Sequence, residues 1–307
     1  MIEILLIIAP LFLIIFGTAI FQKIKTVPES WESVLNAFAL NIGLPALIFL
    51  ALASTHLTFS EELPLLLTNS ALILSSFVLT FVICRIFQLK PKTLRTIFIC
   101  LGFSNVAYLG IPVLTQTQGE SVLPTASLIV AVYVFWIFTV GLGLLNYTQL
   151  KNKRGIVTKV FKSLIKNPLL IAVVLGLLAS GLRLEIPGII EKAISMLAAS
   201  VTPIVLVVIG LFIGKSKFGN IKKWIPILIF SAFTLIAFPG ALYLATHYFN
   251  LTGEIFKISI IDAAIPLAIT PFALADQFKL DKNFIARSIV LSTILSVITI
   301  PFWTSLM

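Results

Sequence analysis

Charged residues are scarce in this chain. Only 11% of its 307 residues are Asp, Glu, Lys or Arg, whereas 59% are hydrophobic. Soluble domains carry about 25% charged residues, because a chain folded in water needs them on its surface. This composition, with a mean hydropathy of +1.11, excludes a water-soluble fold. It indicates an all-α integral membrane protein with roughly a dozen crossings at most, since each helix needs about 20 apolar residues.

Cysteine and histidine are nearly absent, with two residues of each. Cys84 and Cys100 are too few for a disulfide framework, and neither histidine has a metal-ligand partner at a useful spacing. We therefore expect no metal and no cofactor. A membrane enzyme needs a catalytic pair, and the chain offers only a lone Asp262 and a distant His247. We therefore expect no enzymatic activity.

Ten apolar runs follow one another along the chain, and we expect each to cross the membrane. They cover residues 2–22, 31–54, 64–88, 94–117, 122–148, 167–182, 188–214, 224–249, 255–278 and 283–306. The basic residues behind the net charge of +10 lie mainly in the odd-numbered connections, while the connections 55–63 and 118–121 contain no Lys or Arg. Cytoplasmic loops carry such an excess. We therefore expect a multi-pass protein of the cell (inner) membrane, with both termini extracytoplasmic and no nucleic-acid partner.

Prolines recur at a spacing of about half the chain. The distance from Pro45 to Pro203 nearly equals the distance from Pro112 to Pro271. This spacing predicts two five-span repeats, residues 1–150 and 167–307, joined by a basic cytoplasmic linker at 151–166. Because five is odd, the second repeat enters the membrane from the opposite face, as in many transporters. Coincidence among fifteen prolines is the alternative.

The fourth and ninth runs contain prolines flanked by small and polar residues, which predicts broken helices. Proline removes a backbone hydrogen bond and clashes one turn back, and the freed groups must face protein or a water-lined cavity. Pro112 and Pro271 suit the first turn of restarted half-helices, whose N-termini favour an anion. Structural kinks are the alternative. We expect substrate contacts from Asn41, Ser104, Asn105, Gly110, Pro112, Pro266, Thr270 and Pro271.

Asp262 is the one carboxylate well inside an apolar run. Burial of an ionised carboxylate in a membrane is costly. Asp262 is therefore a candidate for ion coupling, either as a proton-binding carboxyl or as a cation ligand beside freed carbonyls. Exposure to water in an outer vestibule is the alternative.

Several motifs make the sequence resemble the auxin efflux carrier family, which includes plant PIN-formed auxin exporters and bacterial malate and malonate permeases. Its larger relatives include the sodium–bile acid symporters. The most specific motif is Asn-x-x-x-x-Gly-Ile-Pro, from Asn105 to Pro112. Further matches are Asn36 with Pro45, Asn167-Pro168, Leu197 through Pro203 to Gly210, Ile265-Pro266 with Ala275, Ser292-Thr293 and Pro301.

The resemblance implies a transport bundle from spans 3–5 and 8–10, with spans 4 and 9 crossing at their prolines and the substrate carboxylate beside Asn105. Spans 1, 2, 6 and 7 then form a scaffold and a homodimer contact. Plant carriers have a charged support site in span 3, where this chain has Asn69 among Ser and Thr residues, which argues against auxin itself.

The expected function is secondary transport of a small organic anion, such as malate, malonate or an auxin-like acid, by alternating access. Proton or sodium coupling stays open. The alternative is a channel or a ligand-sensing receptor on a transporter fold. The expected partners are the carboxylate, the lipid bilayer and a second copy of the chain.

Overall fold

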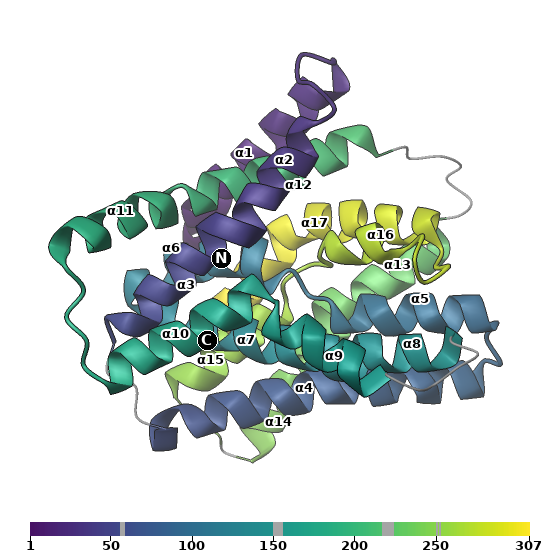
Figure 1. Ribbon diagram of the computed structural model, residues 1–307. Coiled ribbons are helices and arrows are strands. Elements are labelled where there is room, and N and C mark those ends of the chain that lie inside the picture. The colour runs from purple at the N-terminus through teal and green to yellow at the C-terminus, as the bar shows by residue number, and fades with distance from the viewer. Residues whose placement is uncertain (56–58, 150–155, 217–223, 250, 252) are drawn as a thin grey trace.

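The computed structural model describes residues 1–55, 59–149, 156–216, 224–249, 251 and 253–307. Within these residues the regular structure is entirely helical (Figure 1). The N-terminal half contains α1 (Ile2–Lys23), α2 (Trp31–Phe38), α3 (Leu44–Ala53), α4 (Phe59–Ile86), α5 (Pro91–Gly102), α6 (Ile111–Gln118), α7 (Leu123–Trp136) and α8 (Leu142–Gln149). The C-terminal half contains α9 (Ile156–Ile165), α10 (Pro168–Gly181), α11 (Gly188–Ala199), α12 (Val201–Lys215), α13 (Ile225–Ala232), α14 (Phe238–Tyr248), α15 (Glu254–Ala263), α16 (Thr270–Leu274) and α17 (Lys282–Ser305).

Seven continuous helical stretches in the described residues are long and apolar enough to cross a membrane. They are Ile2–Lys23, Trp31–Ala53, Glu62–Ile86, Glu120–Asn146, Gly188–Lys215, Ile225–Tyr248 and Lys282–Ser305. The pair α9 and α10, bent by 60° at its junction, gives an eighth candidate. The expected run at 94–117 is helical at both ends but interrupted in the middle. The expected run at 255–278 contains α15 and the short α16, with a break between them and a turn after Leu274. Neither run therefore forms one continuous span.

In the part of the chain that the structure describes, four π-helical turns interrupt the longer helices, and three of them end two residues before a proline. These are η1 (Ala39–Gly43) before Pro45, η2 (Val106–Gly110) before Pro112 and η6 (Phe233–Ala237) before Pro239; the fourth is η4 (Ile137–Gly141). A wider turn accommodates proline, which lacks the N–H for the usual bond and crowds the carbonyl one turn back.

This pattern corrects the expectation for Pro112. We expected this proline to begin the restarted half-helix, but the helix already restarts at Val106. Pro112 follows the π turn within the same helical run. The residue widens the helix rather than breaking it, because the break lies at Phe103–Asn105.

The basic linker expected at 151–166 is only partly a linker. Residues 151–155 lie outside the described residues, but Ile156–Ile165 form helix α9. The run of Ile, Val, Phe and Leu in this helix is interrupted by lysines. It is too short to look like a membrane span, which is why hydropathy alone did not separate it from a loop.

Helices α1 and α12 pack closely along their length, with α2 beside them (Figure 1). Gly210 and Gly214 of α12 face α1, and a Cβ atom added at Gly214 would lie 2.5 Å from the Ala19 carbonyl oxygen. Two glycines four residues apart allow the backbones of membrane helices to approach closely. Elsewhere α4 packs on α5 and α7, and α17 packs on both α1 and α13.

Candidate functional site

The two interruptions meet and bond to each other through their backbones. The Asn105 N–H donates to the Pro266 carbonyl at 2.9 Å, and the Ala268 N–H donates to the Phe103 carbonyl at 2.9 Å. Ser104 and Leu267 form an isolated antiparallel bridge between these bonds. Backbone groups freed by a broken helix are costly in an apolar interior, and this pairing satisfies them. The break in one half of the chain therefore depends on the break in the other.

Side chains fasten the crossing further. The Ser104 hydroxyl donates to the Ile265 carbonyl at 3.1 Å, and the Leu267 N–H donates to Ser292 Oγ of α17 at 3.3 Å. Ser104 was expected only as a substrate contact. Its hydrogen bond gives it a structural part at the crossing as well.

A cavity of about 580 Å³ lies against the crossing, within the range of about 300–1,000 Å³ typical of small-molecule sites. It brings together four residues expected at the site from sequence, namely Asn41, Ser104, Asn105 and Thr270. The other polar lining residues are Glu32, Ser33, Asn36, Tyr108, Tyr133, Ser163, Lys166 and Asn167. The remaining lining is mostly apolar, so polar contacts come from a limited set of side chains.

The helix that restarts after the crossing begins at the cavity wall. Val106, Ala107 and Tyr108 are its first residues, and all three line the cavity. The first N–H groups of a helix have no partner within the helix, and together with the helix dipole they favour an anion. The Asn105 carbonyl accepts from the N–H groups of Leu109 and Gly110 at 3.0 Å each.

Tyr108 and Asn36 join two walls of the cavity. The Tyr108 hydroxyl donates to the Asn36 side-chain oxygen at 2.7 Å and so ties η2 to α2. Sequence reasoning noted Asn36 but did not place it among the expected substrate contacts, and it did not select Tyr108 or Tyr133. Nothing in the local pattern distinguishes these tyrosines from packing aromatics, because their partners lie far away in the sequence.

Four expected contact residues do not line the cavity. Pro266 contributes its backbone carbonyl to the crossing. Pro112 and Pro271 are buried in the first turns of α6 and α16. Gly110 lies against Asp262, since a Cβ atom built on Gly110 would lie 3.0 Å from Asp262 Oδ1. These residues therefore support the backbone of the crossing and of the helices next to it, and they do not contact the cavity directly.

Asp262 is 1% exposed at the C-terminal end of α15. Its Oδ2 atom has no hydrogen-bond partner among the described residues. This burial excludes the reading in which Asp262 is exposed to water. A buried carboxyl with an unpaired oxygen is neutral or holds a cation, because an isolated buried carboxylate is costly.

The mouth of the cavity carries charges of both signs. Glu32 lines the cavity and forms a salt bridge of 2.8 Å with Lys215. Lys166, an exposed residue just after α9, also lines it. With Glu32 paired to Lys215, Lys166 adds a positive charge at the entrance.

Membrane-length apolar helices arranged around a cavity at two interrupted, paired segments are features of a multi-pass membrane transport protein. Residues 4–304, nearly the whole chain, match the family model described as "Membrane transport protein", in agreement with this assignment. The chain belongs to this family, which includes auxin efflux carriers. The resemblance inferred from the sequence is therefore confirmed.

Two relatives align with nearly the whole chain, and a third aligns with about half of it. An uncharacterized transporter from Methanocaldococcus jannaschii is 25% identical over 98% of this chain and 97% of its own length. A Rhizobium meliloti protein named "Putative malonate transporter" is 23% identical, covering 98% of this chain and 94% of that protein. Auxin efflux carrier component 1 of Arabidopsis thaliana is 24% identical over 47% of this chain and 24% of its own length.

Proposed function

We propose that the protein is a secondary transporter of a small organic carboxylate and that it works by alternating access. The observation that carries this proposal is the cavity at the crossing, where Asn105 and the first residues of a restarted helix face a space of small-molecule size. The names of two relatives, one with malonate and one with auxin, support a carboxylate such as malonate, malate or an auxin-like acid.

The proposed architecture has ten spans in two inverted five-span repeats. Every expected run coincides with helical structure, and the two interrupted runs occupy equivalent places in the two halves. Their bridge is antiparallel, which suits segments that enter the membrane from opposite faces. In this architecture α1, α3, α10, α11 and α12, which pack on one another, belong to the scaffold and to the contact with a second copy.

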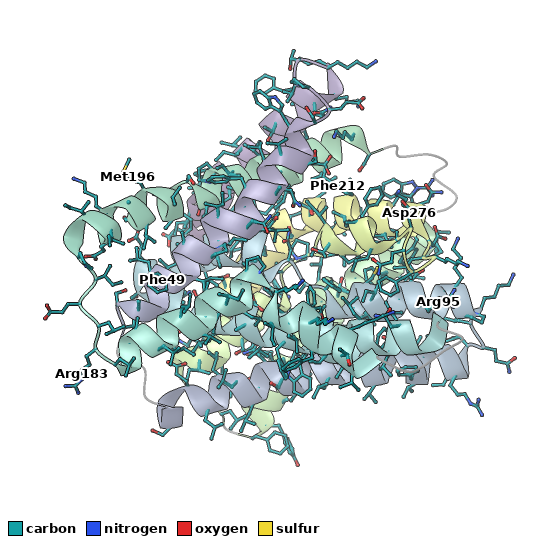
Figure 2. The ribbon with its side chains drawn as sticks, in the orientation of Figure 1. Phe49, Arg95, Arg183, Met196, Phe212 and Asp276 are labelled. Carbon is teal, nitrogen blue, oxygen red and sulfur yellow. The ribbon has the colours of Figure 1, made fainter. Side chains whose placement is uncertain are left out.

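The proposed topology places both termini outside the cell. Arg95 and Asp276 lie at one end of the molecule, and Arg183 lies at the other (Figure 2). This separation supports the assignment of Arg95 to the cytoplasmic side and Arg183 to the outside. Glu32 and Lys166 follow basic cytoplasmic connections in that assignment, so the cavity opens toward the cytoplasm. Transport then requires a second state in which the crossing is reached from outside.

The proposed coupling residue is Asp262. A Cβ atom added at Gly110 would lie 3.0 Å from its Oδ1 atom. Its Oδ2 atom has no hydrogen-bond partner in the described part of the chain and can hold a proton or a cation. Gly110 belongs to the π turn that begins at the cavity wall. A proton or cation bound at Asp262 therefore shifts the position of the restarted helix, and a shift of that helix changes binding at Asp262.

Uptake by proteoliposomes tests the function. A panel of mono- and dicarboxylates is offered to the unmodified protein, with pH and sodium gradients imposed separately. Asn105→Ala is compared with Asn146→Ala, a matched control because the Asn146 side chain donates to the Leu142 carbonyl within α8, at 2.8 Å, and Asn146 does not line the cavity. We expect gradient-driven carboxylate uptake that Asn105→Ala removes and the control keeps. Uptake that follows the substrate gradient alone, with a measurable conductance, would instead indicate a channel.

A further inference from the structure

Helix α9 carries an exposed apolar stripe that no other part of the described chain covers. Val157, Phe161 and Ile165 are 82%, 61% and 57% exposed. Residues four apart lie on the same face of a helix, so the three side chains form one continuous strip. Exposure of this size on a ten-residue helix needs an apolar environment outside the protein.

A second face of this segment is cationic. Lys159, Lys162 and Lys166 are all exposed. At about 100° per residue, the lysines cluster within about 60° of arc, centred roughly 130° from the apolar stripe. The sequence from residue 156 to 167 contains no Asp or Glu, so no acidic residue within this segment offsets the three positive charges.

The third face holds the helix against the protein. Val160, Ser163 and Leu164 are half-buried, on the side where α9 packs against α8 and η4. The apolar stripe and the lysines are therefore both left outside, on different sides of the same helix. This division into a protein face, an apolar face and a cationic face is typical of a helix that lies at a membrane surface.

The junction with α10 sets the direction of α9. Asn167 caps α10 by accepting hydrogen bonds from the N–H groups of Leu169 at 3.0 Å and Leu170 at 3.4 Å, and Pro168 follows it directly. The two helices are bent by 60° at this point. If α10 follows the membrane normal, α9 is turned well toward the membrane plane. Its apolar stripe can then enter the acyl boundary while the lysines remain at headgroup level.

We propose that α9 is a binding surface for anionic phospholipids in the leaflet at its end of the molecule. Val157, Phe161 and Ile165 insert into the acyl boundary, and Lys159, Lys162 and Lys166 bind the phosphate groups. Each basic residue near an anionic membrane surface contributes about 1 kcal/mol. Removing two of the lysines therefore lowers the local enrichment of anionic lipid by roughly 30-fold, since 1.4 kcal/mol corresponds to a factor of ten.

This surface also has a place in transport. Ser163 and Lys166 line the cavity mouth, so a lipid that holds α9 fixes one edge of the entrance. This consequence rests on the proposed function, whereas the lipid binding itself does not. We expect carboxylate uptake to be faster in vesicles that contain phosphatidylglycerol than in pure phosphatidylcholine, and we expect Lys159→Gln/Lys162→Gln to reduce that difference.

The lipid binding is tested without any substrate. A fluorophore is attached to Thr158→Cys, an exposed position between the two outer faces; both native cysteines are buried, and the unmodified protein gives the labelling background. The full chain is reconstituted in phosphatidylcholine vesicles with trace acceptor-labelled phosphatidylglycerol or acceptor-labelled phosphatidylcholine. Energy transfer is compared between the two acceptors. The control double variant is Lys90→Gln/Lys92→Gln, which removes the same charge from another exposed connection.

We expect stronger transfer to phosphatidylglycerol than to phosphatidylcholine, loss of this preference in Lys159→Gln/Lys162→Gln, and its persistence in the control variant. Equal transfer to the two lipids in the unmodified sequence would overturn the proposal. An unchanged preference in Lys159→Gln/Lys162→Gln would do the same. Lipid preference without any carboxylate uptake would leave the lipid surface standing and count against the proposed function alone.

Discussion

Replacement of Gly214 by alanine tests the close packing of α1 and α12. The added Cβ atom would lie 2.5 Å from the Ala19 carbonyl oxygen and 2.7 Å from Gln22 Cβ, whereas ordinary contact begins at 3.4 Å. One of these neighbours is backbone, so it cannot rotate away. The two helices must separate by up to about 0.9 Å, and overpacking of this kind costs about 1–3 kcal/mol.

The matched control is Gly17→Ala in α1, because a Cβ atom added there meets nothing within 4 Å. In both variants alanine replaces glycine inside a helix, which favours the helix by about 1 kcal/mol. The difference between them therefore isolates the steric cost of about 1–3 kcal/mol. Thermal unfolding of the purified protein in detergent micelles, followed by tryptophan fluorescence, measures this difference. We expect a lower midpoint for Gly214→Ala than for Gly17→Ala, and equal midpoints would refute the close approach of the two backbones.

Three further substitutions test the crossing and its surroundings. Asp262→Asn should make carboxylate uptake insensitive to imposed pH and sodium gradients. The control Asp276→Asn, at an exposed salt bridge, should keep the gradient dependence. If Asp262→Asn also keeps it, Asp262 has no part in coupling. Gly110→Ala places a methyl group 3.0 Å from the Asp262 carboxylate and should weaken coupling in the same uptake assay, with normal coupling arguing against their contact. Asn69→Ala removes the 2.9 Å hydrogen bond to Ser259 that joins α4 to α15. This loss should lower the free energy of unfolding by about 1–3 kcal/mol. An unchanged unfolding midpoint would contradict that bond.

Hydropathy located the helical segments well, because a membrane-spanning helix can be recognised in the sequence from its length and apolar composition. Helix α1, expected at 2–22, runs from Ile2 to Lys23, and α17, expected at 283–306, runs from Lys282 to Ser305. The break in the fourth run was also foreseen from its proline and small residues. Its position was not, because a proline can be accommodated by a π turn as at Pro112, and neighbouring packing decides between widening and breaking.

The composition of the cavity could be predicted only in part. Asn105 and Thr270 stand beside recognisable interruptions, so the sequence pointed to them. The bond between Tyr108 and Asn36 joins residues far apart in sequence, and no local periodicity predicts such a pair. The same holds for the contact of Gly110 with Asp262. Both residues were selected from sequence, but for separate reasons.

The central claim is that the crossing holds a small carboxylate beside Asn105. Calorimetric titration of the detergent-solubilised protein with malonate and malate tests this claim most directly, with Asn105→Ala and Asn146→Ala measured alongside. The account predicts saturable binding of at least one of these acids to the unmodified protein and to Asn146→Ala, and loss of that binding in Asn105→Ala. Binding that is equally strong in Asn105→Ala would contradict it.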